Sequence, residues 1–187
     1  MPGNHSALLV MDVQNGIVQR FAEKPEVIAP IQRAVNAARG TGIPVIFVRV
    51  AFRDGYPEVS AMNKSFSAIA SRGNMTISDA STQIHASVAP RPDEPVVIKL
   101  RVSAFSGSDL QVILRSRGID TLILTGIATS GVVLSTLREA ADKDYRLVVL
   151  SDACLDADPE VHRVLVEKLF PRQADVLTVS EWADTLP

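Results

Sequence analysis

The sequence predicts an α/β fold, in which residues 1–187 form a single domain around a doubly wound parallel six-stranded sheet with helices on both faces. Short runs rich in Val, Ile and Leu alternate along the chain with longer segments of helical period. The short runs are almost continuously apolar, which is typical of strands buried on both faces. The length of 187 residues suits one domain, and we find no internal repeat or interdomain linker.

Six apolar runs are the predicted strands of this sheet. They cover residues 7–11, 45–50, 96–100, 121–124, 146–150 and 175–178. The segments between most of them are long enough to hold a crossover helix, and parallel strands need such connections. This spacing therefore favours a parallel sheet over a series of hairpins.

Four of the connecting segments carry the apolar period and the end signals of helices. They cover residues 26–39, 109–117, 131–143 and 159–169. Gly40 follows the first and Gly118 the second, and glycine is common just past the end of a helix. The fourth begins with Asp158 as a plausible N-cap and Pro159 at the first helical position.

One connection breaks this pattern. Residues 51–94, between the second and third predicted strands, are rich in Ser, Asn, Arg and Pro and are far longer than a usual crossover. Long connections in compact domains commonly carry function. We therefore expect part of this segment to line a ligand pocket.

Composition excludes several classes of partner and compartment. The formal net charge is −2, the isoelectric point is near 5.9, and no block of five or more Lys and Arg is present, so we expect neither a nucleic-acid nor a membrane partner. The single cysteine, Cys154, has no partner for a disulfide within the chain. The N-terminus lacks the pattern of a signal peptide, and together these features predict a cytoplasmic protein.

Two charged residues occupy the ends of predicted strands. Asp12 follows the first strand and Lys99 lies near the end of the third. In open parallel sheets ligands bind beyond the carboxyl ends of the strands, so this pair is a candidate for proton transfer in a cleft. The alternative is a structural ion pair, with Asp12 capping a turn and Lys99 reaching to water.

The segment 125–131, TGIATSG, predicts a tight turn from the fourth strand into a helix. Backbone N–H groups in such a turn can bind an anion or a developing oxyanion, although many glycine-containing turns are purely structural. The spacing G-x-G-x-x-G is absent and no Lys follows Gly131. Dinucleotide and P-loop nucleotide sites are therefore not expected.

Five motifs in order along the chain resemble one protein family. They are LLVMDVQN (8–15), VIKLRVSAFSGSDL (97–110), TGIATSGVVLST (125–136), SDAC (151–154) and FPRQADV (170–176). The chain resembles isochorismatase-like proteins, also called the cysteine hydrolase family, which include nicotinamidases, N-carbamoylsarcosine amidases and isochorismatases. The resemblance covers nearly the whole length and implies a parallel sheet flanked by helices.

The resemblance also implies roles for individual residues. Asp12 and Lys99 correspond to the catalytic Asp and Lys of the family. A non-proline cis peptide bond is implied at Ile127–Ala128, and the backbone N–H groups of Ala128 and Val132 would form an oxyanion hole. Candidate substrate-binding residues are Gln14, Phe105 and Thr129 in the motifs and Arg53 and Tyr56 in the long connection. Family members commonly form dimers or tetramers, so we expect a homo-oligomer.

The pattern departs from the family at its nucleophile. Amidases of this group carry a reactive cysteine at the position of Val132, and valine cannot form an acyl intermediate. Cys154 follows another strand and is interpreted as a small buried residue. Isochorismatases hydrolyse a vinyl ether without a thiol, but they have an Ala-His pair where this chain has Thr129 and Ser130.

Three functional hypotheses follow from these residues. The first is a hydrolase that acts on a small carboxylated metabolite by Asp/Lys acid–base chemistry without a cysteine nucleophile. The second is a catalytically inactive homologue that binds a small molecule. The third is a Cys-to-Val variant of an amidase, in which thiol-dependent activity is absent.

We expect no metal and no other cofactor. Nicotinamidases place an Asp and histidines after their second strand, whereas no histidine lies near residues 48–57 of this chain. His5, His85 and His162 are scattered in sequence, and a surface or packing role is favoured for His162 within its helix.

Overall fold

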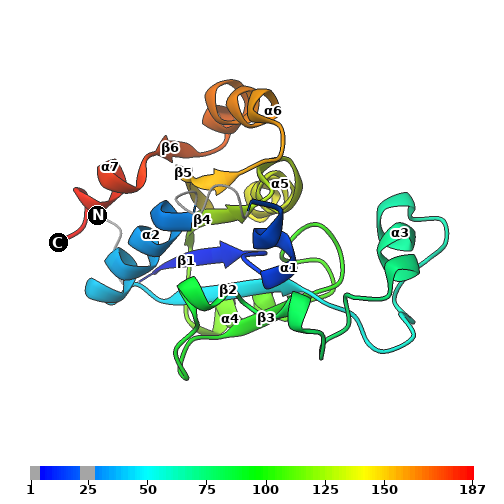
Figure 1. Cartoon of the computed structure of the whole chain (residues 1–187). Coiled ribbons are helices and arrows are strands. Elements are labelled where there is room, and N and C mark those ends of the chain that lie inside the picture. The colour runs from blue at the N-terminus through cyan, green and yellow to red at the C-terminus, as the bar shows by residue number, and fades with distance from the viewer. Residues whose placement is uncertain (1–4, 22–27) are drawn as a thin grey trace.

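The computed structural model describes residues 5–21 and 28–187, which form one parallel sheet with helices on both faces (Figure 1). The strand order is β3-β2-β1-β4-β5-β6, and all neighbouring strands are parallel. The strands are β1 (Ser6–Met11), β2 (Val45–Val50), β3 (Val96–Lys99), β4 (Thr121–Ile127), β5 (Arg146–Leu155) and β6 (Asp175–Leu177). This arrangement confirms the predicted fold class.

The central strand β1 shows how the sheet is held between two hydrophobic cores. All six of its residues are buried. Because side chains alternate along a strand, Leu9 and Met11 pack into one core while Leu8 and Val10 pack into the other. Each fully buried leucine stabilises the fold by about 2 kcal/mol relative to its exposed state.

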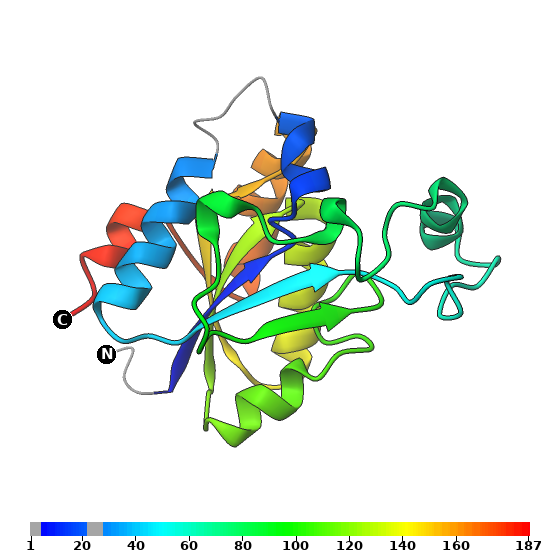
Figure 2. The ribbon, with the colours of Figure 1, turned by 60° about the horizontal axis from the view of Figure 1, so that its bottom comes forward.

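Helices cover both faces of the sheet (Figure 2). The helices are α1 (Asn15–Val18), α2 (Ala29–Gly40), α3 (Lys64–Arg72), α4 (Leu110–Ser116), α5 (Leu134–Asp142), α6 (Pro159–Val164) and α7 (Val179–Ala183). Residues of α4 and α5 pack into the core that contains Leu9, whereas α2 and α7 pack into the core that contains Leu8. No helix in the described part of the chain is long and apolar enough to cross a bilayer.

Several predicted boundaries need correction. β4 extends to Ile127 and β5 to Leu155, several residues beyond the predicted ends. The helix predicted at 26–39 is α2, which begins at Ala29, and residues 26–27 lie outside the described residues. The helices predicted at 131–143 and 159–169 each contain a π-helical turn, at η5 (Thr129–Val133) and η6 (Leu165–Leu169).

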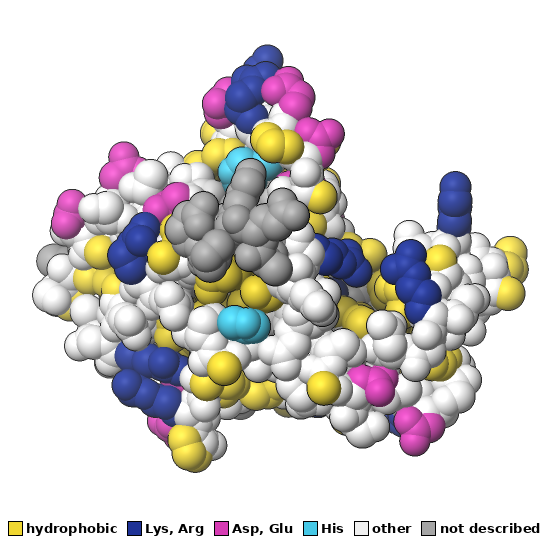
Figure 3. All heavy atoms as spheres, in the orientation of Figure 1, with side chains coloured by type: hydrophobic (Ala, Val, Ile, Leu, Met, Phe, Trp, Pro, Cys, Tyr) yellow, Lys and Arg dark blue, Asp and Glu magenta, His cyan; other side chains and the backbone are white. Residues whose placement is uncertain are grey.

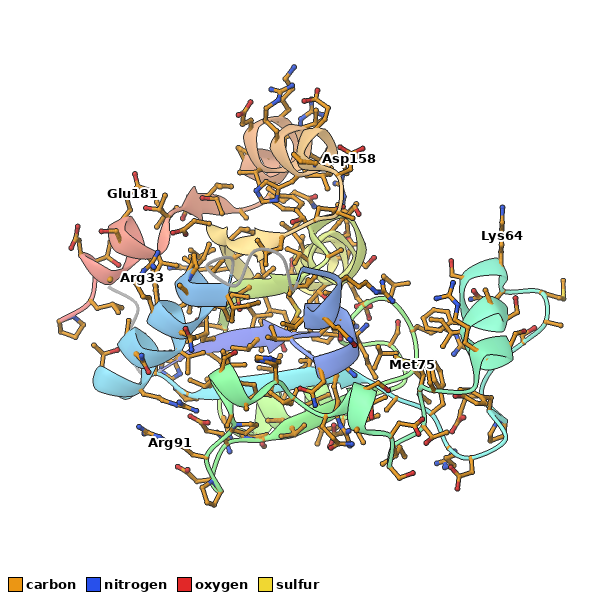
Figure 4. The ribbon with its side chains drawn as sticks, viewed as in Figure 1. Arg33, Lys64, Met75, Arg91, Asp158 and Glu181 are labelled. Atoms are coloured by element: carbon orange, nitrogen blue, oxygen red, sulfur yellow. The ribbon has the colours of Figure 1, made fainter. Side chains whose placement is uncertain are left out.

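The predicted cap of the fourth helix is confirmed. The Asp158 carboxylate accepts hydrogen bonds from the backbone N–H groups of Glu160 and Val161 at 2.9 and 3.3 Å. These amides have no acceptor inside the helix, so the cap fixes where α6 begins. Figure 4 shows Asp158 at this end of α6.

The long connection contains a segment that stands away from the sheet, which we call the arm (residues 53–75; Figures 1 and 2). It carries α3, which the sequence analysis did not predict. Its base is closed by backbone hydrogen bonds from Phe52 N–H to Met75 O (2.9 Å) and from Ile77 N–H to Phe52 O (2.8 Å). Figure 4 shows Lys64 at the upper end of α3, with its side chain pointing upward from the arm.

Candidate active site

The predicted pair of charged residues meets at the carboxyl edge of the sheet. Asp12 directly follows β1 and Lys99 ends β3, with β2 between these strands. The Lys99 Nζ atom lies 3.0 Å from Asp12 Oδ2, and the two side chains are 3% and 8% exposed. The sheet thus places a buried ion pair where open α/β folds bind ligands.

The backbone at Asp12 directs its carboxylate. Asp12 has φ 56°, a left-handed conformation that Asp tolerates better than most residues. Its Oδ2 atom contacts Lys99, whereas its buried Oδ1 atom has no hydrogen-bond partner among residues 5–21 and 28–187. Burial raises the pKa of Asp12, and the charge and hydrogen bond of Lys99 oppose this shift more weakly. The net direction, which sequence could not decide, is upward.

Lys99 is held in place by the loop that follows it. Its ammonium donates hydrogen bonds to the backbone carbonyls of Arg101 and Val102, both at 3.0 Å. With Asp12 as a third acceptor, all three N–H groups of the ammonium have partners. The cation is therefore fixed in one position beside the carboxylate.

The turn after β4 forms a second side of the site. The peptide bond between Ile127 and Ala128 is cis, at the position that the family resemblance implies. A Cβ atom on Gly126 would lie 2.3 Å from Met11 O, so only glycine allows β4 to approach β1 this closely. The Ala128 N–H group has no acceptor within the described chain, and Val132 is almost fully buried.

These elements enclose a cavity of about 680 Å³. Its walls come from strand ends, from η1 (Gln19–Phe21), from the arm and from the start of α6. The lining includes Asp12, Arg20, Lys99, Ala128, Val132 and His162. Apolar side chains, among them Ile17, Phe66 and Ile69, supply much of the remaining wall. Figure 3 shows Lys and Arg side chains on both sides of the notch between the body and the arm.

Three predicted substrate-binding residues, Gln14, Arg53 and Tyr56, are not among the residues that line this cavity. The Gln14 amide donates to the carbonyls of Val50 and Thr82 and accepts from Val50 N–H, so it ties the long connection to the sheet. Arg53 is 72% exposed and pairs with Glu58 at 2.8 Å. The Tyr56 hydroxyl accepts a hydrogen bond from a backbone amide within the arm.

The other two predicted substrate-binding residues, Phe105 and Thr129, are also absent from the cavity lining. Phe105 is buried in the core and its ring packs 6.0 Å from that of Tyr145. Thr129 is fully buried, and its hydroxyl lies 2.8 Å from His162 Nδ1. The expectation that the long connection lines a pocket holds through different residues, Ser65, Phe66 and Ile69 of α3.

Several charged or polar wall residues, among them Arg20 and His162, were missed by sequence reasoning. Arg20 follows a four-residue helix that has no recognisable apolar period. His162 was interpreted as a surface or packing residue of its helix, but it lines the cavity. Neither position carries a local signal, because each becomes a wall residue only through the tertiary arrangement.

Cys154 also lies in the cavity wall but is not a reactive thiol. It is 1% exposed, and burial raises the pKa of its thiol to about 12. The thiol is therefore protonated at neutral pH and is a weak nucleophile. Within residues 5–21 and 28–187, no group of three or more His, Cys, Asp or Glu side chains is arranged to hold a metal ion.

Comparison with known proteins agrees with these features. The family model described as the isochorismatase domain matches residues 6–181. The isochorismatase family protein YecD of Escherichia coli O157:H7 is 34% identical over 185 residues, covering 97% of this chain and 96% of that protein. The ureidoacrylate amidohydrolase RutB of Stutzerimonas stutzeri is 35% identical over 183 residues, covering 86% and 73% of the two chains.

Solved structures share the fold. A cysteine hydrolase from Pseudomonas syringae pv. phaseolicola superposes with a TM-score of 0.88 at 24% identity, covering 98% of this chain and 93% of that chain. At this identity the likeness concerns the fold alone.

Proposed function

Because the chain belongs to the isochorismatase family of hydrolases, we propose that it hydrolyses a small carboxylated metabolite by acid–base chemistry of Asp12 and Lys99, without a covalent thiol intermediate. The observation that carries this proposal is the buried Asp12–Lys99 pair, 3.0 Å apart on the wall of a large cavity. One carboxylate oxygen of Asp12 is left without a partner in the described chain.

Asp12 has the properties of a general acid. Burial raises its pKa above the ordinary value of a carboxyl group, which favours the protonated form that a general acid needs. Its buried Oδ1 atom has no hydrogen-bond partner in the described chain, while Oδ2 is held by Lys99. Lys99 then stabilises the carboxylate that remains after the proton has left.

Water must supply the attacking atom in this site. Val132 occupies the position of the family's thiol, and the Cys154 thiol is buried and protonated. For a vinyl ether, Asp12 would donate its proton to the alkene carbon, and water would add to the resulting oxocarbenium ion. The hemiketal then collapses to a ketone and an alcohol, and the proton released from water returns to Asp12.

The turn after β4 would polarise a substrate oxygen. The Ala128 N–H group lacks an acceptor among the described residues, and Ala128 lines the cavity together with Val132. When the substrate is a carbonyl compound such as a ureido acid, backbone amides held in this way stabilise the negative charge that develops on its oxygen in the transition state. We assign the oxyanion site to the backbone N–H groups of Ala128 and Val132.

Arg20 supports a carboxylated substrate. It is an exposed guanidinium on the cavity wall, and it makes no ion pair with a carboxylate of the described chain. Guanidinium groups bind carboxylates through paired hydrogen bonds. The relative RutB is named for ureidoacrylate, which is also a carboxylate.

Val132 in place of the family's cysteine favours a second candidate, a protein that binds a small molecule but has lost catalysis. Such a protein could have an amidase site that lacks its nucleophile. This candidate predicts tight binding without turnover. It also predicts that Val132→Cys gains amidase activity that the parent chain lacks.

A substrate panel tests the proposal. It contains carboxylated vinyl ethers such as isochorismate, ureido acids such as ureidoacrylate, and the methyl ester of each compound as an uncharged control. We expect the parent chain to turn over a carboxylated member, with the ester poorer and with Arg20→Gln raising KM at least tenfold. Turnover of acid and ester at equal kcat/KM would contradict the assignment of the substrate class.

A further inference from the structure

His162 is a polar cavity residue to which the proposed mechanism gives no role. It lies on α6, whose first residues follow β5, so it approaches the cavity from a different element than Asp12 and Lys99. The ring is half-buried and lines the same cavity as this pair. Its two nitrogen atoms have different surroundings, and these decide what the ring can do.

Thr129 determines which ring nitrogen carries the proton. Its Oγ1 atom is 2.8 Å from His162 Nδ1, and Thr129 is fully buried. Its hydroxyl has no other hydrogen-bond partner within residues 5–21 and 28–187. A buried O–H group without an acceptor is costly, so the hydroxyl donates to Nδ1. Nδ1 is then an acceptor, and the proton of the neutral ring resides on Nε2.

Hydrogen bonds join the elements on either side of the His162 ring. Asp156, between β5 and α6, accepts a hydrogen bond from Ser130 N–H at 2.7 Å. Together with the contact between Thr129 and His162, this bond ties the turn after β4 to the start of α6. The elements that carry Thr129 and His162 are therefore held side by side, with Nδ1 within reach of the Thr129 hydroxyl.

The charge of the ring follows from its surroundings. Burial lowers the pKa of His162, and the Asp156 carboxylate opposes this shift more weakly. Besides His162 and Asp156, the charged residues of this cavity wall in the described chain are Asp12, Arg20 and Lys99. The ring is therefore neutral at pH 7 and presents one N–H donor.

We propose that the Nε2–H group of His162 is a substrate-binding donor that holds a carboxylate or carbonyl oxygen in the cavity. Because Nδ1 accepts the hydrogen bond from Thr129, Nε2 is the ring nitrogen that remains available to a ligand in the cavity. The inference rests on the proposed function, because it assumes that the cavity takes a small carboxylated molecule. His162 would position the substrate, while Asp12 transfers the proton.

The tautomer is measured directly by long-range ¹H–¹⁵N correlation spectra of the histidine rings in the full chain. We expect a protonated Nε2 and an unprotonated Nδ1 for His162. His5 is an internal control of the opposite kind, because its Nδ1 lies 2.8 Å from the carbonyl oxygen of Gly118 and must donate. In Thr129→Val the preference of His162 for one tautomer should weaken. A proton on Nδ1 of His162 in the parent chain would overturn the proposal.

Ligand binding is measured with benzoate as a carboxylate probe and benzamide as its uncharged counterpart. His162→Leu removes the donor, and His162→Gln keeps an N–H group near the position of Nε2. We expect the Leu variant to bind benzoate at least tenfold more weakly, and the Gln variant to recover most of that loss.

The outcomes separate the two proposals. Equal benzoate affinity in His162→Leu and the parent chain would overturn the role of His162 and leave the proposed substrate class intact. Failure of the parent chain to bind benzoate, while benzamide binds, would overturn the carboxylate class and this inference with it.

Discussion

Replacing Lys99 with methionine removes the cation from the buried pair while keeping a side chain of similar length. Asp12 Oδ2 would lose its partner at 3.0 Å, and the backbone carbonyls of Arg101 and Val102 would lose the donor that they share. The substitution leaves a buried carboxylate without compensation. We therefore expect Lys99→Met to be strongly destabilising at neutral pH.

The magnitude follows from the geometry of the pair. Two unit charges at the observed separation attract by roughly 5 to 6 kcal/mol when the effective dielectric constant is about 20. Breaking a buried pair by removing one partner typically costs about 3 to 5 kcal/mol. We expect a loss in this second range, which a domain of ordinary stability survives.

The loss should depend on pH, because Asp12 can take up a proton. Lys99 lowers the pKa of Asp12 against the stronger effect of burial, so Lys99→Met raises this pKa further. A carboxyl group whose pKa is higher in the folded than in the unfolded state favours folding at low pH. That stability is fully present below the pKa of Asp12 in the unfolded state, about 3.8, and is lost as pH rises through its pKa in the folded state. The slope reaches about 1.4 kcal/mol per pH unit.

The assay is urea denaturation at pH 5 and pH 8, followed by the fluorescence of the buried Trp182 and by circular dichroism. Lys143→Met is the matched control, because Lys143 pairs with Glu139 at 3.6 Å and both side chains are about 30% exposed. It should lose no more than about 1 kcal/mol at either pH. The double variant Asp12→Asn/Lys99→Met should recover most of the stability. A loss below about 1 kcal/mol at pH 8, or an equal loss at both pH values, would refute the reasoning.

Three further predictions concern the scaffold of the site. Gly126→Ala should lose at least about 3 kcal/mol of unfolding free energy or fail to fold, because its Cβ atom would overlap Met11 O. Gly40→Ala is the control, because its Cβ atom would meet no atom within 4 Å. It should change stability by less than about 1 kcal/mol in the same urea titration. Gln14→Leu should lose about 2 to 4 kcal/mol, because three buried hydrogen bonds disappear, and native-state hydrogen exchange should then show increased opening of the long connection. Asp158→Ala should lower the free energy of unfolding by about 1 kcal/mol through loss of the α6 cap, and unchanged thermal stability would contradict that role.

The sheet and the pairing of Asp12 with Lys99 were predictable from the sequence because both depend on regular features. Continuous apolar runs mark strands that are buried on both faces, and residues at strand ends must gather at one edge of a parallel sheet. The motifs added the expected turn at Ile127–Ala128. These features come from local periodicity and from chain order, which a sequence displays directly.

The direction of side chains around the site was not predictable. Gln14 follows Asp12 closely and was expected to face the substrate. The left-handed backbone at Asp12, with φ 56°, and the buried hydrogen bonds to Val50 and Thr82 turn Gln14 into the scaffold instead. Nothing in the sequence displays that change in backbone direction.

The outer wall of the cavity was missed for a related reason. Arg20 lies beyond a helix of four residues, which is too short to show a period. His162 acquires its role through a hydrogen bond to Thr129, which is 33 positions away in sequence. A small hydrophobic core joins Phe66 of the arm to Val50 and Phe52 of the body. The helix α3 nevertheless lies in a polar stretch, where propensity alone is a weak guide.

The most direct test of the central claim compares three rates of hydrolysis of the best panel substrate. They are the rates of the parent chain, of Asp12→Asn, and of the parent chain treated with a thiol-alkylating reagent. Acid–base catalysis without a thiol predicts at least a 100-fold loss of kcat in Asp12→Asn and an unchanged rate after alkylation. A parent chain that is inactive on the whole panel, while Val132→Cys hydrolyses an amide substrate, would contradict the claim.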